Sequence, residues 1–394
     1  MRFESQAAAA ALLLSVTVLG SHGFDENGTD AEPRVCTQPV QEICKDYPAQ
    51  EERRHAMQTQ WKELALKKTE EQFAKGTDFS KYLKIISTNA KSITFENAEE
   101  VKIFRRILAR YHLNLREAMG LTDKKLTKYL EESKVAMVAA IRANGALSAE
   151  TKKEMEAKVS KTQLVSFETA VTGVVEVQGK TLERLMTNYT SICGWDGFGG
   201  LALNHYLWAT ATGTDPQSGK KVEKMVINEN ILFVCPTLFG SAIVEESESL
   251  APTATMAHEV GHSIDDKDFA KSYEAIQACW NEHAAKSLYW PKGADGKPAS
   301  PKGKEREMIA DFWAAEGLAN WLKTRAVTQE DRVRLVKHAV HLKCGTVESP
   351  AHPAGEFRVE AILNHPAIRS VVGCQAPLIS NPACTLSGAV PSSK

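Results

Sequence analysis

The 394-residue chain lacks a surplus of charge of either sign, since 48 lysines and arginines stand against 49 aspartates and glutamates. A protein that binds nucleic acid or an anionic membrane surface usually carries a basic surplus, so no nucleic-acid partner is expected. Internal repeats and low-complexity segments are also missing. With 43% hydrophobic and 25% charged residues, the composition is that of a globular protein, which excludes disorder over most of the length.

Long hydrophobic runs are absent after residue 20, so no stable membrane insertion is expected. The exception is the apolar run Ala7–Gly20, which follows Arg2 and precedes small residues around Ser21 and Gly23, as in a secretory signal peptide. A signal anchor is the alternative, but this run is shorter than the ~20 residues that a membrane-spanning helix needs. We therefore predict a signal peptide over residues 1–23 and a secreted, extracellular protein.

Closely spaced cysteine pairs of the CxxC type are absent, which argues against a structural zinc ribbon or a thiol redox motif. The eight cysteines are scattered along the chain: Cys36, Cys44, Cys193, Cys235, Cys279, Cys344, Cys374 and Cys384. An even number in a secreted chain predicts four disulfides, although eight cysteines allow about 105 pairings and spacing alone does not choose among them. N-glycosylation triplets at Asn27 and Asn188 fit a secreted glycoprotein.

Helical periodicity dominates the first half of the chain. After a polar, turn-rich stretch that ends near residue 50, apolar residues recur every three or four positions over Val101–Leu115. Further helices are expected over Lys124–Arg142 and Thr151–Val159. These residues predict a helical N-terminal region over residues 24–190, with the apolar stripe as its core.

The pattern changes near Cys193, where glycines crowd into a loop. Two short strands, Met225–Ile227 and Ile231–Val234, are predicted around a turn at residues 228–230. Helical periodicity then returns around His258 and over Arg306–Arg325, on either side of a Gly-, Pro- and Lys-rich surface loop. The fold class expected is mainly α with a small β component (α+β), with the functional region over residues 191–394.

The sharpest motif is His258-Glu259-Val260-Gly261-His262. Residues four apart share one face of a helix, so both imidazoles can bind one zinc ion while Glu259 lies beside the open coordination position. The alternative is a pair of surface histidines on an amphipathic helix. A catalytic zinc site also needs a third protein ligand and one position left for water.

The best candidate for that ligand lies in the segment from Glu307 to Asp311, where two carboxylates again stand four residues apart. Glu307 can bind the metal while Asp311 accepts a hydrogen bond from the outer nitrogen of a bound imidazole. Taken alone, such a pair is more often a solvated helix edge. The apolar neighbours Ile309, Ala310 and Phe312 favour a buried helix, where paired carboxylates need a partner.

Together these motifs resemble the neprilysin and endothelin-converting-enzyme family of zinc metallopeptidases. The family's zinc helix continues with two aspartates, and its other elements also have counterparts in the same order. The matching residues are Asp265-Asp266, Glu307 with Ala310 and Asp311, Cys344-Gly345-Thr346, His352 with Arg358, and Asn204-His205-Tyr206. The resemblance covers about 180 residues. It departs from the family at Met308 and His205, and in the length of the chain, since members are usually about twice as long.

The resemblance implies a zincin-type catalytic domain with a reduced N-terminal helical region and one Zn²⁺ per chain, bound by His258, His262 and Glu307. It also implies roles for further residues, among which no spacing argument singles out His352, Arg358 or Asn204. Glu259 acts as general base, His352 donates a hydrogen bond to the developing oxyanion, and Asp311 orients a zinc ligand; Arg358 and Asn204 bind the substrate main chain. Asp265 is expected to have a structural role only.

The resemblance further implies the disulfides Cys36–Cys374, Cys44–Cys344 and Cys279–Cys384, and it leaves Cys193–Cys235 as the fourth. The function expected is a secreted zinc-dependent endopeptidase that hydrolyses peptides or proteins, on the amino side of hydrophobic residues. The alternative is a non-catalytic secreted binding or structural protein on a reduced metallopeptidase scaffold. Glu259 discriminates between them, because a protein without catalysis has no need of the base.

Overall fold

The computed structural model describes residues 32–73, 79–89, 94–165, 174–177, 180–184, 193–197, 201–210, 213–214, 221–222, 225–235, 250–265, 267–325, 328–375, 378 and 382–390. Within these residues the chain is mainly helical with a small β component, which confirms the predicted fold class at that level. The predicted signal peptide, both glycosylation asparagines and the predicted boundary at residue 190 lie outside the described residues.

The N-terminal part begins with helices where the sequence predicts turns. Two short helices, α1 (Arg34–Thr37) and α2 (Pro39–Cys44), lead into the long helix α3 (Tyr47–Phe73), which is followed by α4 (Phe79–Thr88). The turn-rich interpretation of this stretch, which is expected to end near residue 50, is therefore wrong for the helical residues 34–37, 39–44 and 47–50. Pro39 is compatible with a helix because it stands in the first turn, where its missing N–H removes no intrahelical hydrogen bond.

The three helices predicted from periodicity are present as α5 (Ala98–Ala118), α6 (Asp123–Ala143) and α7 (Ala149–Ser160). Each begins at a capping side chain: Asn97, Thr122 and Ser148 accept a hydrogen bond from the backbone N–H three residues later. Helix α5 packs along α3, and α6 packs against α7.

A five-stranded sheet follows these helices, with the strand order β1-β7-β4-β3-β2. Strand β1 runs parallel to β7, and the other neighbours are antiparallel. The strands are β1 (Gln163–Val165), β2 (Val174–Val177), β3 (Lys180–Arg184), β4 (Leu201–Thr210) and β7 (Met225–Val234). Two small ribbons pair β5 (Gly213–Thr214) with β6 (Lys221–Val222) and β8 (Ala383–Thr385) with β9 (Gly388–Val390).

The predicted turn at residues 228–230 is wrong, because β7 is one continuous strand. It pairs along its length with β4, and Asn228 lies opposite Tyr206 while Ile231 lies opposite Asn204. The register shifts there, because two residues of β7, Glu229 and Asn230, stand opposite His205 alone in β4, and the chain does not reverse. Pairing with a long neighbour therefore overrides the local turn preference of the sequence Asn-Glu-Asn.

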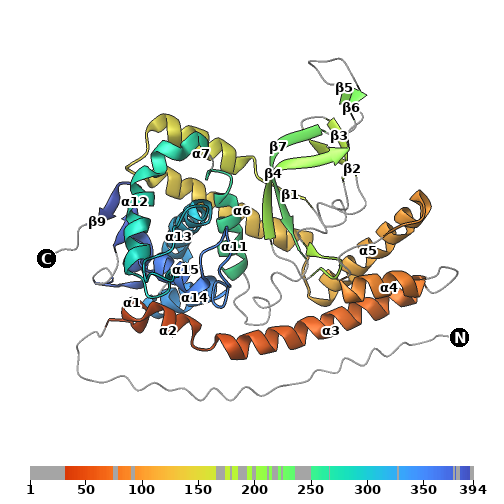
Figure 1. Cartoon of the computed structure of the whole chain (residues 1–394), viewed down its shortest axis with the longest axis horizontal. Coiled ribbons are helices and arrows are strands. Elements are labelled where there is room, and N and C mark those ends of the chain that lie inside the picture. Colours follow the sequence, from red (N-terminus) through yellow and green to blue (C-terminus); the bar gives the residue numbers. More distant parts are fainter. Residues whose placement is uncertain are drawn as a thin grey trace, which may run out of the picture. The chain divides into compact units, whose positions relative to one another are not determined.

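The C-terminal part is a group of packed helices (Figure 1). They are α11 (Leu250–Gly261), the 3-10 turn η1 (Lys267–Phe269), α12 (Ala270–Lys286), α13 (Glu305–Arg325), α14 (Gln329–His341), α15 (Gly355–Leu363) and α16 (Pro366–Val372). The helices predicted around His258 and over Arg306–Arg325 are thus α11 and α13. Helix α11 contacts α13, α6, α14 and strand β4, so it lies at the junction of the helices and the sheet.

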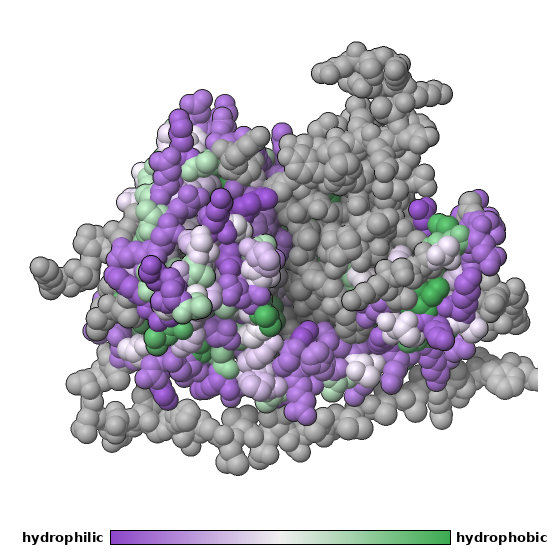
Figure 2. Space-filling view, viewed as in Figure 1, coloured by the Kyte–Doolittle hydropathy of each residue, from purple (hydrophilic) through white to green (hydrophobic). Residues whose placement is uncertain are grey.

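Four disulfides connect distant parts of the chain, and the pairings match those that the resemblance implies. They are Cys36–Cys374, Cys44–Cys344, Cys193–Cys235 and Cys279–Cys384. Four such bonds indicate an extracellular or otherwise oxidising environment. No helix among the described residues has the length and apolar character of a membrane span. In the part of the surface that is coloured in Figure 2, hydrophobic residues form small separate spots among mostly hydrophilic ones.

Candidate metal centre

Helix α11 carries His258, and His262 follows directly after its last residue, so the two histidines of the sequence motif lie side by side. The rings of His258 and His262 have centroids 4.9 Å apart, one turn of helix from each other. The helix is held by its buried residues Met256 and Val260. Glu259 lies on the same stretch and is only 12% exposed, with Oε1 4.0 Å from Nε2 of His258.

A close approach of two helices brings the third side chain to the histidines. A Cβ atom at Gly261 would lie only 3.0 Å from Cα of Ala310, so α11 and α13 pack with their backbones nearly in contact. Glu307 on α13 thereby places its Oε2 3.2 Å from Nε2 of His258 and its Oε1 3.3 Å from Nε2 of His262. Glu307 therefore lies where the sequence predicts it, within reach of both histidines.

These three residues fit a metal ion. One ligand atom from each of His258, His262 and Glu307 lies within 4.8 Å of the others. The Oε2 atom of Glu307 is buried and accepts no hydrogen bond, although Nε2 of His258 lies 3.2 Å and Nη2 of Arg358 lies 3.4 Å from it. A metal ion at the three ligand atoms would give this oxygen a direct partner. Two imidazoles and one carboxylate are a typical ligand set for a catalytic zinc ion.

Each histidine is oriented by its own carboxylate. Nδ1 of His258 lies 2.8 Å from Oδ1 of Asp311, and Nδ1 of His262 lies 2.5 Å from Oδ2 of Asp265. The outer ring nitrogens are thus engaged, and both Nε2 atoms face Glu307. The contact of Asp311 is the one expected from the sequence. Asp265 is expected to have a structural role only, but it contacts a candidate metal ligand. Its spacing of three residues from His262 is the feature of the sequence that could have indicated this contact.

Positively charged side chains contact Asp311 and Asp265, the two outer carboxylates that orient the histidines. Arg358 is buried and holds Asp311 through two contacts, Nε to Oδ2 at 2.6 Å and Nη2 to Oδ1 at 2.9 Å. Lys343 also reaches Asp311, with Nζ 3.2 Å from Oδ1, and Arg306 donates to Asp265 at 2.7 Å. The guanidinium of Arg358 is therefore paired within the site, and its expected contact with a substrate stays a prediction. Sequence reasoning missed Lys343 and Arg306.

The carboxylates around His258, His262 and Glu307 favour positive charge at these three residues. Burial opposes protonation of His262, but its contacts with Asp265 and Glu307 outweigh burial and raise the pKa of His262 to about 10. Burial favours the neutral form of Glu307, yet the two histidines hold the pKa of that carboxyl well below its usual range. Burial acts likewise on Asp311, and Arg358, Lys343 and His258 together hold its pKa well below the usual value. The carboxyl groups of Glu307 and Asp311 are therefore ionised, and a metal cation bound by His258, His262 and Glu307 would be attracted by these negative charges.

Of the remaining predicted residues, His352 contacts this cluster, whereas the side chain of Asn204 is not described. His352 is half-exposed, with Nε2 3.3 Å from Oε1 of Glu307 and Nδ1 3.0 Å from the hydroxyl of Ser349. The structure thus brings together seven of the eight predicted residues. Asn204 stands in strand β4, which contacts α11, but its side chain lies outside the described part of the chain.

No protein-family model, curated protein or solved structure matches this chain.

Proposed function

We propose that the protein is a secreted zinc-dependent endopeptidase of the neprilysin type. The observation that carries this proposal is the convergence of His258, His262 and Glu307 on one point, with Glu259 adjacent in the helix. The two motifs that supply these residues are 45 residues apart in the chain. A scaffold that kept the metal but had lost catalysis would have no need of Glu259.

His258, His262 and Glu307 would hold the metal, and three protein ligands leave a position open for reactants. When bound there, zinc acts as a Lewis acid that polarises a carbonyl and lowers the pKa of water. Asp265 and Asp311 keep both histidines in the tautomer that offers Nε2. Other divalent ions are alternatives that metal analysis distinguishes from zinc.

The protein's own groups would carry the proton transfers. Glu259 takes a proton from the attacking water and later gives it to the leaving amine, a role that suits a carboxylate beside the open position. His352 lies at the partly exposed side of Glu307, from which its ring can donate a hydrogen bond to the developing oxyanion. Arg358 binds the substrate main chain only if it releases one contact with Asp311.

The sheet offers a place for an extended peptide. Within the described residues, Leu201–Trp208 of β4 pairs with β7 on one side, while β3 pairs only with Ala209 and Thr210. The side of this stretch away from β7, which has no partner among the described residues, can add a substrate strand by main-chain hydrogen bonds, next to helix α11. This arrangement supports a zincin-type domain and a role for Asn204 in substrate binding.

The decisive experiment uses the purified protein and a mixed peptide library, with and without a zinc chelator. We expect cleavage on the amino side of hydrophobic residues, abolished by chelation and restored by zinc. Glu259→Gln should retain the metal and lose activity by about 10²- to 10⁴-fold. Glu330→Gln, at an exposed carboxylate in the first turn of α14, is the matched control and should leave both unchanged. Wild-type activity in Glu259→Gln would refute the mechanism, and a metal-loaded but inactive wild type would favour the binding protein.

A further inference from the structure

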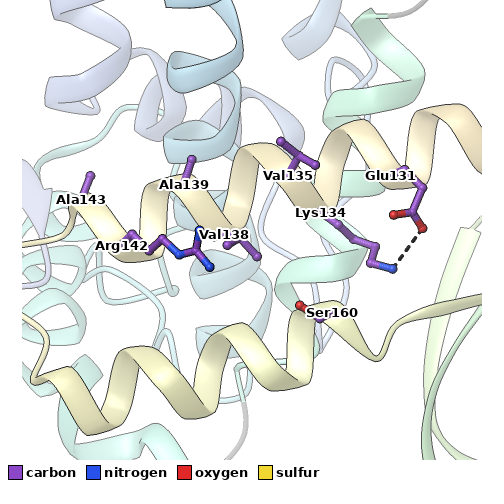
Figure 3. Close-up of a pocket in the computed structure, with 8 residues that line it drawn as sticks. All are labelled: Glu131, Lys134, Val135, Val138, Ala139, Arg142, Ala143 and Ser160. Carbon is purple, nitrogen blue, oxygen red and sulfur yellow. Dashed lines mark hydrogen bonds and ion pairs between the residues drawn. The ribbon is translucent and has the colours of Figure 1, made fainter.

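The outward face of α6 is an apolar ridge between two grooves. Val135 is 69% exposed, and Ala139 continues its line four residues on. One groove, of about 910 Å³, lies between α6 and α7, and Figure 3 shows Val138 and Arg142 directed from α6 toward α7 there. The second groove, of about 350 Å³, lies between α6 and α13 and is lined by Val135 and Trp321. A ridge flanked by grooves is the surface by which helices pack against each other.

The charges on this face are arranged with opposite signs at its two ends. Glu131 stands at one end and Arg142 at the other, and their side chains are 56% and 67% exposed. Between them, Val135 and Val138 are spaced symmetrically about the same midpoint of the helix. If a second α6 lies antiparallel on the first, Glu131 meets Arg142 of the other copy, and Val135 meets Val138. The face is thus complementary to itself about a two-fold axis.

We propose that a second copy of this chain docks on α6 in this antiparallel manner. The apolar centre would be buried in the grooves and two ion pairs between Glu131 and Arg142 would close the ends, as charged flanking positions do in coiled coils. The present partners of these residues are Lys134 and Glu156, whose side chains are 15% and 23% exposed; Glu131 and Arg142 are themselves more than half exposed and can each add a second contact. The inference is independent of the proposed peptidase activity.

The inner side of α6 makes the docking surface rigid. Its buried residues Tyr129, Met137 and Ile141 pack into the protein, and the hydroxyl of Ser133 donates to the backbone oxygen of Thr253 in α11 at 2.7 Å. A rigid face loses little conformational freedom on binding. One helix face is nevertheless small beside the ~800 Å² per partner of a standard interface, so the dimer should dissociate on dilution.

Sedimentation velocity on the full chain, over a concentration series from low micromolar to near-millimolar, tests the dimer. We expect a monomer–dimer equilibrium that Val135→Glu weakens by about tenfold or more, because it buries a charge at the centre. Leu64→Glu, at an exposed leucine of α3, is the matched control and should leave the equilibrium unchanged. A wild type that stays monomeric throughout, or a dimer that Val135→Glu does not weaken, would overturn the proposal.

Charge reversal tests the antiparallel register. Glu131→Arg alone and Arg142→Glu alone should each weaken the self-association, since like charges then meet at both ends. Mixing these two variants should restore dimers, because every pair in the mixed dimer joins opposite charges; the double variant should also self-associate. Glu99→Arg, an exposed glutamate of α5, is the matched control. If the mixture dimerises no better than either variant alone, α6 does not pair in this register.

Discussion

Each histidine of the candidate metal centre has a carboxylate behind it, and the two carboxylates differ in what holds them. Asp311 is shared between His258, Arg358 and Lys343, so its loss would disturb several contacts. Asp265 serves His262 and is otherwise held by Arg306, whose side chain is 57% exposed. Asp265 is therefore the cleaner position at which to test the effect of an outer carboxylate on the metal.

Asp265→Asn should weaken zinc binding by about 10- to 100-fold, because the neutral amide is a poorer acceptor for Nδ1 of His262 and lowers its basicity. Competition with a chelator of known affinity measures the change. Asp268→Asn, an exposed aspartate that pairs with Lys158, is the matched control and should bind zinc as the wild type does. Equal affinities for wild type and Asp265→Asn would show that this carboxylate has no role at the metal.

A second residue, Glu316, predicts a pH dependence of stability away from the metal. Burial raises the pKa of Glu316 to about 7, from a usual value of 4.5. Burial also lowers the pKa of its neighbour His365 to about 3, so the imidazole, 3.6 Å away, is neutral near pH 7 and offers no positive charge. The folded chain then keeps a proton on Glu316 that the unfolded chain releases, and stability falls as the pH rises from about 4.5 to about 7.

Glu316→Gln removes this loss because the amide stays neutral. Relative to the wild type, the variant should gain on the order of 1–3 kcal/mol in free energy of unfolding at pH 8 and little at pH 4. Denaturant titrations at both pH values measure the difference. Glu282→Gln, at an exposed ion pair with Lys286, is the control and should change little at either pH. A gain at pH 4 equal to that at pH 8 would contradict the titration.

Whether a residue of the site could be predicted from the sequence depends on whether its position follows from a pattern within one helix. His258, His262, Glu307 and Asp311 could be predicted because positions four apart share a helix face whatever the rest of the fold does. The pairing of Asp265 with His262 depends on how the chain turns after α11 ends, which the spacing only suggests. Lys343 follows the end of α14 and contacts Asp311 on α13, so no pattern within its own segment could have predicted this contact.

At the scale of elements, the distance between α11 and α13 decides whether the third ligand reaches the histidines. That distance is set where Gly261 meets Ala310, with no room for a larger residue. Helices whose apolar residues repeat every three or four positions, such as α5 and α6, could be predicted from the sequence because the repeat is local. The continuity of β7 could not, because it depends on pairing with β4, a strand about twenty residues earlier.

Gly261→Ala should therefore push α11 away from α13. Overpacking costs about 1–3 kcal/mol and the better helix propensity of alanine returns roughly 1 kcal/mol, so unfolding should become easier by up to about 2 kcal/mol. Zinc affinity should fall as well, because Glu307 retreats from the histidines. Gly145→Ala is the control, since a Cβ there meets nothing within 4 Å. Unchanged zinc binding in Gly261→Ala would mean that the helices adjust without moving the ligand.

At the scale of the whole molecule, two disulfides fasten the N-terminal helices to the C-terminal end of the chain. Cys36–Cys374 and Cys44–Cys344 close loops of 338 and 300 residues. The bonds are nested, because their N-terminal cysteines are only eight positions apart and their C-terminal ones thirty positions apart. When one bond is present, the other therefore closes a loop of only about 40 residues, and the two cannot contribute independently.

This nesting predicts a non-additive loss of stability. In the chain-entropy model, removing either bond alone, as Cys36→Ser with Cys374→Ser or as Cys44→Ser with Cys344→Ser, should cost about 4 kcal/mol, the value for a loop of about 40 residues. Removing both should cost about 9–10 kcal/mol, more than the sum, because the long loop is then opened as well. Denaturant unfolding of the three variants, with the other two disulfides intact, measures the cycle. Simple additivity would show that unfolded-state structure or native strain, and not loop closure, governs how these bonds stabilise the protein.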